Sequence, residues 1–418
     1  LVPDDPSFPD QWALDQPSDC DVNAPEAWSQ ETGRPHVVIA VLDTGIDLDA
    51  AAFAGRLLTG RNVIDEGLPP ADENGRGTQL ASLVAAAGND GTGIAGLCWG
   101  CSILPVKVSD DSGLTYTYRV ADGIVWAAQQ GADLILVGQS HPSPNSGLFS
   151  AVQDARALGA LTFGPAGDAA NTYEYIPAAY YSAIGVGATG LEDLWAGSYT
   201  NDPDHGSNHH DKVDLVAPGD WVLVSGLDGL QERVSRTRFA TAYAVGAAGL
   251  ALSAQRTLGL DELSQLLLAG ARDEVGDPAQ DVAGHDEYHG HGRLDAEHVV
   301  QGARSARSLV VEQGTGTTVR LEVSADIALA YDFVRGQVSG LSFLESPPEV
   351  HLGALVCLEN NSPDASTEGV LVDEDPLPGQ AFFYLARIVT RIEERSYGGS
   401  SDHLDRRSWS GDCGYGAP

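Results

Sequence analysis

Two aspartates and two arginines stand at the ends of apolar segments, where side chains from different parts of a fold can meet. Asp43 ends the run HVVIAVLD and Asp168 follows GALTFGPAG, whereas Arg76 and Arg238 precede stretches rich in small residues. Two carboxylates placed together can act as general acid and general base if one of them keeps its proton. Arginines beside them would hold both carboxylates ionised, so the sequence does not favour this chemistry.

The elements that must position these residues are predicted to be alternating strands and helices. Continuous short apolar runs are typical of buried parallel strands, and stretches such as YTYRVADGIVWAAQQG have the helical period. We expect strands within 36–47, 102–108, 132–138, 159–164, 183–188 and 213–219, and helices at 77–87, 116–131, 239–256 and 261–271. This alternation predicts an α/β fold, a doubly wound parallel sheet with helices on both faces.

The character of the chain changes after residue 304. The segment SARSLVVEQGTG (305–316) is expected to be a linker that runs into a strand. Residues 317–418 show alternating polarity, Gly and Pro turns and no helical stretch, which predicts a small all-β sandwich domain. The predicted domains are therefore 1–304 and 317–418. Within the second, YDFVRGQVSGL loosely resembles a strand of a fibronectin type III-like module.

Composition excludes two classes of partner. The formal net charge of −36 would repel phosphates, so we expect no nucleic-acid partner. No apolar run approaches the roughly 18 residues that span a bilayer, so we expect no membrane span. The sequence begins at Leu1 and contains no methionine, from which we expect a processed form of a secreted or extracytoplasmic protein.

Five cysteines are consistent with an oxidising compartment if four of them pair. Cys98 and Cys101 precede a β-branched strand rather than opening a helix, which favours a local disulfide over a redox-active pair. Cys357 and Cys413 are candidates for a second disulfide in the C-terminal region, and Cys20 would then be unpaired.

Several short segments, in the correct order, resemble the subtilases, the subtilisin-like serine proteases. PDDPSFPDQWAL and VNAPEAW resemble the start of the family's mature chain, and VLDTGID resembles the motif of its catalytic aspartate. NDGTGIAG, SILPVKV, VDLVAPG and GHGRLDA match as well, so the resemblance covers residues 1–303. It implies a subtilisin-like fold and gives Asp43 the position of the triad acid.

The family's histidine and serine positions hold residues that cannot perform those roles. The histidine motif is GRGTQLAS here, with Arg76 at the base, Gln79 at the second histidine and Ser82 at the last glycine. The serine motif is RTRFATAY, with Arg238 at the nucleophile and Ala242 at the flanking proline. Arginine cannot accept a proton near neutral pH, because its pKa lies above about 12.

The positions that bind the oxyanion and the substrate have changed too. The oxyanion motif is PAGD, and a carboxylate at Asp168 would repel a developing negative charge. The segment that pairs with a substrate in the family, typically Ser-x-Gly, consists of Gly138, Gln139 and Ser140. These three residues are the candidate peptide-binding edge.

A shifted alignment of the serine motif would place Ala240 or Thr241 at the nucleophile position. Thr241 would still lack a base, and the run FATAYAVGAAG fits best without a shift. The unshifted alignment is therefore preferred.

The substitutions suggest a pairing of opposite charges. In the family fold, Arg76 would face Asp43 and Arg238 would face Asp168. Because an unpaired buried guanidinium costs several kcal/mol, we hypothesise two ion pairs, bidentate in geometry, that fill and close the former cleft. The alternative is independent drift of exposed residues.

No cofactor is expected to be required, and the resemblance implies at most a structural calcium ion. The family's site would use the Asp5 and Asp90 carboxylates and the carbonyls of Gly88, Thr92 and Ile94. A further aspartate of the family corresponds to Ala52, which weakens the site. The alternative is an ordinary Asn/Asp/Gly turn.

The histidine-rich segments HGSNHHD (205–211) and HDEYHGH (285–291) raise the question of a zinc site. They lack clean ligand spacing, and no cysteine is near. We therefore predict solvated loops.

These observations predict a secreted, catalytically inactive subtilase homologue, a pseudoprotease that binds a peptide or protein partner. One alternative is a residual hydrolase with a mechanism unlike that of the family. The other is a rigid scaffold whose C-terminal β-module mediates adhesion.

Overall fold

The computed structural model describes residues 1–305 and, after them, strand segments that lie between residues 309 and 407. The chain divides into two compact units, Leu1–Ala303 and Arg304–Pro418, and each is described by itself.

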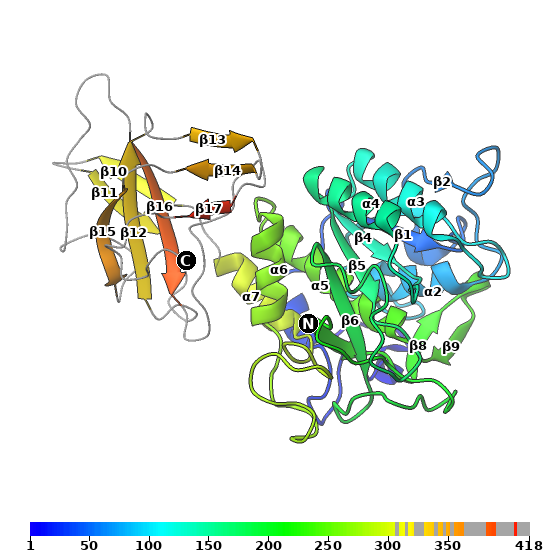
Figure 1. The fold of residues 1–418 in the computed structure, drawn as a ribbon. Helices are drawn as coiled ribbons and strands as arrows, with labels where there is room; N and C mark the ends of the chain where they lie inside the picture. Colours follow the sequence, from blue (N-terminus) through cyan, green and yellow to red (C-terminus); the bar gives the residue numbers. More distant parts are fainter. Residues whose placement is uncertain are drawn as a thin grey trace. The chain divides into compact units, whose positions relative to one another are not determined.

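A parallel sheet of seven strands forms the centre of the first unit (Figure 1). Its order is β2-β3-β1-β4-β5-β6-β7, with strands Arg61–Asn62 (β2), Ser102–Lys107 (β3), Val38–Asp43 (β1), Leu134–Val137 (β4), Leu161–Pro165 (β5), Ala183–Thr189 (β6) and Leu215–Pro218 (β7). From β1 the chain continues to β3 on one side and later to β4 on the other. Doubly wound sheets leave a crevice at such a reversal, outside the carboxyl ends of the strands.

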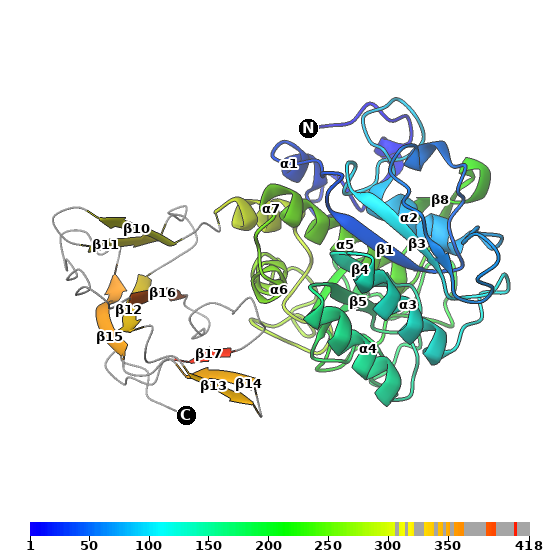
Figure 2. The ribbon, with the colours of Figure 1, turned by 90° about the horizontal axis from the view of Figure 1, so that it is seen from above.

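Two pairs of helices cover the two faces of this sheet (Figure 2). On one face α3 (Thr117–Gln129) packs against α4 (Ser146–Ala157), and on the other α2 (Arg76–Ala85) packs against α5 (Thr237–Ala254). The core under α3 and α4 includes Leu42, Val106, Ile124, Val152 and Ala155. The predicted α/β fold is confirmed, and the four predicted helices are found within two residues of their expected ends.

Helix α5 is buried almost throughout because its side chains are small. Alanine and glycine dominate its sequence, TRFATAYAVGAAGLALSA, so that the sheet and α2 can approach its backbone closely. A helix that is apolar all round is typical of a protein core. Its first residue, Thr237, bonds to the backbone just after β5, at Gly167, and this places Arg238 beside the crevice.

Further elements complete the first unit. These are the helices Ala24–Trp28 (α1), Leu260–Ala269 (α6) and Ala296–Ser305 (α7), the hairpin of Val222–Ser225 (β8) and Gln231–Val234 (β9), and the 3₁₀ turns Phe8–Asp10, Ala51–Phe53 and Leu227–Gly229. Helix α4 and the β8–β9 hairpin were not specified by the sequence patterns.

In the second unit, the described segments after Ser305 are all strands. They are Leu309–Gln313 (β10), Thr317–Leu321 (β11), Ala330–Gln337 (β12), Ser342–Glu345 (β13), Pro348–His351 (β14), Leu355–Ser362 (β15), Phe382–Val389 (β16) and Asp405–Arg407 (β17). Strand β10 lies inside the predicted linker and pairs with β11, so this segment belongs to a sheet. The predicted sandwich and the fibronectin type III-like resemblance depend on residues outside the described segments.

The predicted disulfide between Cys98 and Cys101 is present, with an S–S distance of 2.04 Å. Cys20 is a free thiol. The suggested partner of Cys357, Cys413, lies outside the described residues. Within the part of the chain that is described, no helix is both long enough and apolar enough to cross a membrane.

The buried Asp72 carboxylate fixes the turn from which α2 begins. It accepts hydrogen bonds from the Thr44 and Thr78 hydroxyls at 2.8 and 2.7 Å and from the backbone N–H groups of Thr78, Gly75 and Asn74. Burial alone would raise the pKa of Asp72, but these hydrogen bonds outweigh it and lower the pKa. The same turn carries Arg76, the first residue of α2.

Replacing Asp72 by alanine is expected to reduce the free energy of unfolding by about 2–4 kcal/mol, because several buried donors lose their acceptor. Since the folded pKa is lowered, the contribution of this carboxylate is full above its unfolded pKa of about 3.9 and is lost as the pH falls through the folded pKa. The D72A penalty measured by denaturant unfolding should therefore shrink in acid.

The control is Asp65→Ala, an exposed aspartate of the same loop that accepts one backbone N–H, from Gly67. Equal penalties for D72A and D65A, or a D72A penalty that grows in acid, would contradict this account.

Candidate functional site: a charge cluster at the crevice

The candidate site lies where three neighbouring strands end. Asp43 is the last residue of β1, Gly138 follows β4, and Asp168 comes shortly after β5. Arg76 is the first residue of α2 and Arg238 the second residue of α5, and these two helices pack together on one face. Residues from five elements thus meet at the crevice that the strand order predicts.

Arg76 forms a direct ion pair with Asp43. Its Nε lies 2.7 Å from Asp43 Oδ1, which also accepts the Thr44 N–H at 2.7 Å. The Asp43 side chain is fully buried and that of Arg76 is 16% exposed. A second guanidinium nitrogen of Arg76 donates to the carbonyl of Gly113 at 3.2 Å. The guanidinium therefore neutralises Asp43 from within the site and is held there by a backbone acceptor.

The second carboxylate oxygen of Asp43 shows that this pair is not bidentate. Oδ2 is buried and has no hydrogen-bond partner. A Cβ on Gly138 would lie 2.0 Å from this oxygen, so only glycine fits at residue 138. The backbone after β4 therefore packs directly on the aspartate, and the expected bidentate geometry is wrong for this pair.

The candidate binding edge, residues 138–140, begins at this contact between Gly138 and Asp43. Gln139 donates from its side chain to the Gly113 carbonyl at 3.3 Å, the same oxygen that Arg76 uses. Gln139 and Ser140 are both half-buried, and His141 forms a bridge with Ile176. Gly113 itself was not predicted, because a backbone carbonyl in a loop leaves no side-chain signal.

Arg238 and Asp168 form a looser pair. Their closest approach, from a guanidinium nitrogen to Asp168 Oδ2, is 3.8 Å, beyond hydrogen-bond distance. Arg238 Nε is buried without a partner. Burial lowers the pKa of Arg238, whereas the charge of Asp168 raises it. Bidentate geometry is wrong here as well.

Asp168 is held by other donors. Its Oδ1 accepts the Thr237 N–H at 2.8 Å, the Thr237 hydroxyl at 3.0 Å and the Tyr199 hydroxyl at 2.7 Å. The Thr237 N–H lies in the first turn of α5, where backbone N–H groups have no acceptor within the helix and the helix dipole also favours a carboxylate. Burial, and then the charge of Asp168, raise the pKa of Tyr199, so its phenol stays protonated and donates.

The two pairs form one charge cluster. The charge of Arg76 lowers the pKa of Arg238 and the charge of Asp43 raises it, so the pairs lie within electrostatic reach of each other. Tyr199 and Thr237 were not predicted from the sequence. Thr237 lies next to Arg238 and was within reach of motif analysis, whereas Tyr199 lies in a loop without a motif.

The other altered motif positions have structural partners. Gln79 donates to Glu232 at 2.6 Å, and the Ser82 hydroxyl accepts the Ser225 N–H at 3.1 Å, both on the β8–β9 hairpin. Thr241 is fully buried and donates to the Thr237 carbonyl within α5. Its hydroxyl faces the helix backbone, so its placement gives no support to the shifted alignment.

The residues of the implied calcium site fit such an ion only in part. Asp5 is buried, and its carboxylate accepts the N–H groups of Asn89 and Asp90 at 2.6 and 3.4 Å. Burial raises its pKa, and the nearby Asp90 carboxylate adds to this. Two adjacent carboxylates favour a cation, and the carbonyls of Gly88, Thr92 and Ile94 lie on the same loop.

Ala52 stands where the family has a further aspartate. It supplies only a carbonyl, which accepts a hydrogen bond from Arg56. The Arg56 guanidinium also donates to Ala85 at 2.6 Å, and the charge of Asp90 acts on it. A protein cation therefore lies near the position where calcium would need this additional carboxylate.

Comparison with known proteins identifies the class. The sequence profile of the Subtilase family matches residues 34–292, more than half of the chain, and this chain belongs to that family. It is 34% identical over 280 residues to thermitase of Thermoactinomyces vulgaris, covering 67% of this chain and 94% of thermitase.

Another protease and a solved structure are also similar to this chain. The halolysin-like extracellular serine protease Nep of Natrialba magadii is 33% identical over 309 residues, covering 72% of this chain and 53% of Nep. Among solved structures, a protease from Pseudoalteromonas arctica PAMC 21717 superimposes with a TM-score of 0.63 at 25% identity, covering 72% of this chain and all of that one. The subtilisin-like fold is thus established.

The two ion pairs are expected to differ in strength, which double-mutant cycles can measure. R76A should cost about 3 kcal/mol in the free energy of unfolding, because it leaves a buried charge uncompensated. The D43A/R76A double variant should cost about 1–3 kcal/mol less than the sum of the single variants. The D168A/R238A cycle should show a coupling below about 1 kcal/mol, since the pair is longer and Asp168 keeps three other donors. Equal couplings in both cycles would contradict the geometry.

Proposed function

We propose that this subtilase is catalytically inactive and acts by binding a peptide or protein partner. The observation that carries the proposal is the Arg76 guanidinium, bonded to Asp43 at the position of the family's general base. No nucleic-acid partner is included, because the chain is strongly acidic.

Loss of proteolysis follows from the chemistry of the substituted groups. A serine protease needs a base that takes a proton from the nucleophile, and a guanidinium only donates. Arg238 offers no hydroxyl or thiol at the nucleophile position. Asp168 would place a negative charge where the reaction needs donors toward an oxyanion. Three of the four chemical roles therefore lack a competent group.

A binding function is supported by exposed apolar side chains beside the charge cluster. Leu114, Tyr116 and Tyr118 are 53%, 50% and 65% exposed, and they follow Gly113, which Arg76 contacts. The two tyrosine rings stack with centroids 5.8 Å apart, and Arg119 lies over both. Clustered exposed aromatic residues with an arginine are typical of binding surfaces.

Secretion and a weak calcium site form part of the same proposal. The relative Nep is described as extracellular, and the Cys98–Cys101 disulfide suits an oxidising compartment. Relatives described as intracellular proteases occur too. When bound, calcium would brace the loop of Asp5 and Asp90 through their carboxylates and contribute stability rather than chemistry.

Hydrolysis of casein and of a mixed peptide library, measured across a pH series with calcium, tests the loss of activity. The full chain is expected to give no turnover above that of its D43A variant, because neither contains a base. An active subtilase in the same buffer serves as the positive control. Turnover that D43A abolishes would establish a residual hydrolase and contradict the proposal.

Fluorescence anisotropy with labelled members of the same library tests the binding function. Removing both rings in the Y116A/Y118A variant should weaken binding at least tenfold. Y181A removes an exposed tyrosine that packs beside α4 and is the matched control. Binding that is equal in all three proteins would exclude this surface, and no binding by wild type would remove the support for a peptide partner.

Calcium dependence is tested by the midpoint of thermal unfolding, Tm. Millimolar calcium should raise the Tm of wild type and of D4N, but not of D5N, because the buried Asp5 carboxylate lies next to that of Asp90. Asp4 is an exposed neighbour that accepts one N–H of the same loop, from Gly91. An unchanged Tm in wild type, or equal shifts in the three proteins, would contradict a calcium site there.

A further inference from the structure

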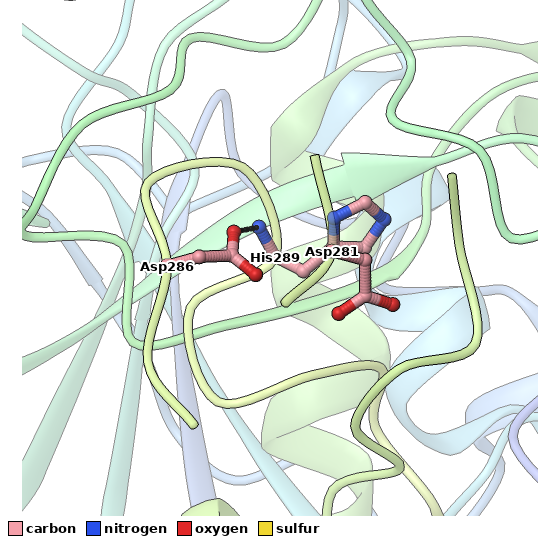
Figure 3. Close-up of side chains that lie close together, drawn as sticks. All are labelled: Asp281, Asp286 and His289. Carbon is pink, nitrogen blue, oxygen red and sulfur yellow. Dashed lines mark hydrogen bonds between the residues drawn. The ribbon is translucent and has the colours of Figure 1, made fainter. Parts of the chain in front are cut away.

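A second cluster of potential metal ligands lies outside the charge cluster, on the loop between α6 and α7. Asp281, Asp286 and His289 each offer one ligand atom, and these atoms lie within 4.8 Å of one another (Figure 3). This is close enough for one divalent ion to contact all three, given metal–ligand bonds of about 2.0–2.6 Å. Nothing in the subtilase mechanism uses these residues.

His289 is the residue that points to a ligand. The sequence predicted a solvated loop here, but this side chain is fully buried, so that prediction is wrong for His289. Its Nε2 lies 3.0 Å from the carbonyl of Asp193, which can only accept, so Nε2 carries the proton. In the neutral form of the ring, Nδ1 is then the unprotonated nitrogen, and it is buried without a hydrogen-bond partner.

An orphaned imidazole nitrogen of this kind is costly unless something satisfies it. The hydrogen bond from the opposite ring nitrogen to a carbonyl is the arrangement that metal-binding histidines use to fix their tautomer. Gly276 packs against the ring, because a Cβ there would lie 2.6 Å from Nε2. The ring is therefore held in one orientation with a free lone pair.

The two carboxylates are held in place by backbone donors. Asp286 accepts the N–H groups of Tyr288 and His289, each at 2.8 Å, and that of Val282 at 3.0 Å. Asp281 is buried and accepts the N–H groups of Gly276 and Glu274 at 2.6 and 3.2 Å. Asp286 Oδ1 accepts two of these bonds, whereas Asp286 Oδ2 and both oxygens of Asp281 accept one each and keep a second acceptor site.

The charge of the cluster is uncompensated. Among the described residues 1–305, no ion pair includes Asp281 or Asp286. The buried Arg293 nearby is already paired with Asp193, at 2.9 Å. Two adjacent carboxylates and an imidazole therefore direct oxygen and nitrogen ligand atoms to the same space.

We propose that Asp281, Asp286 and His289 bind a divalent transition-metal ion, of the zinc type. The imidazole nitrogen selects zinc over calcium or magnesium, which prefer oxygen ligands alone. Three protein ligands leave a coordination position for water, and the ion joins both ends of residues 281–289. The ion would thereby stabilise the loop between α6 and α7, whether or not the chain has proteolytic activity.

Isothermal titration of the metal-stripped full chain with zinc tests this site. Wild type is expected to bind one zinc ion more tightly than H289Q and D286N by at least tenfold, and calcium in excess should not compete. D286N keeps an acceptor for the loop N–H groups, so it isolates metal binding from folding if H289Q is unstable. D277N is the matched control, an exposed aspartate of the same loop that accepts the Ala279 N–H.

Unchanged affinity in D277N together with the loss in D286N would establish the site. Zinc binding that is equal in wild type, D286N and D277N would assign it to scattered surface carboxylates and overturn the proposal. Displacement of zinc by calcium would overturn it as well. Because the readout is metal affinity, it is independent of whether the chain cleaves or binds peptides.

Discussion

The buried carboxylate of Asp43 imposes the main constraint on this molecule. It stands at the end of β1, an inner strand of the sheet, and is fully buried, so that an uncompensated charge there would cost several kcal/mol. In a catalytic triad, the compensating partner is a histidine that alternates between neutral and charged forms. Arg76 supplies a permanent positive charge instead. Under the proposed function, the contact that stabilises the aspartate also removes the proton acceptor.

The second arginine, Arg238, also lies near a carboxylate, but it contributes less to stabilising that charge than Arg76 does. Asp168 is stabilised chiefly by the first N–H of α5 and by the Thr237 and Tyr199 hydroxyls, and Arg238 adds charge from a longer distance. The start of α5, which carries the residue aligned with the family's nucleophile, holds a capping carboxylate. The crevice keeps the family's framework, but its polar groups now bond to one another.

The sequence was sufficient for the fold and for the members of the charge cluster, but not for its geometry. Uninterrupted apolar runs predicted the parallel strands, and the strand–helix alternation predicted a helix at 239–256, where α5 is found. Motif positions paired Arg76 with Asp43 and Arg238 with Asp168. The sequence did not predict the contacts of the Gly113 carbonyl, the Tyr199 hydroxyl or Gly138 with the charge cluster, because these contacts depend on the conformation of loops. The burial of His289 was missed for the same reason.

Mass spectrometry after treatment with a fluorophosphonate, which labels activated serine nucleophiles, tests whether a working catalytic triad remains. The full chain is expected to keep its unmodified mass, since Arg76 occupies the position of the base and no hydroxyl stands at residue 238. A covalent adduct on the wild-type chain that disappears in D43A would contradict it, because it would require a working base beside Asp43.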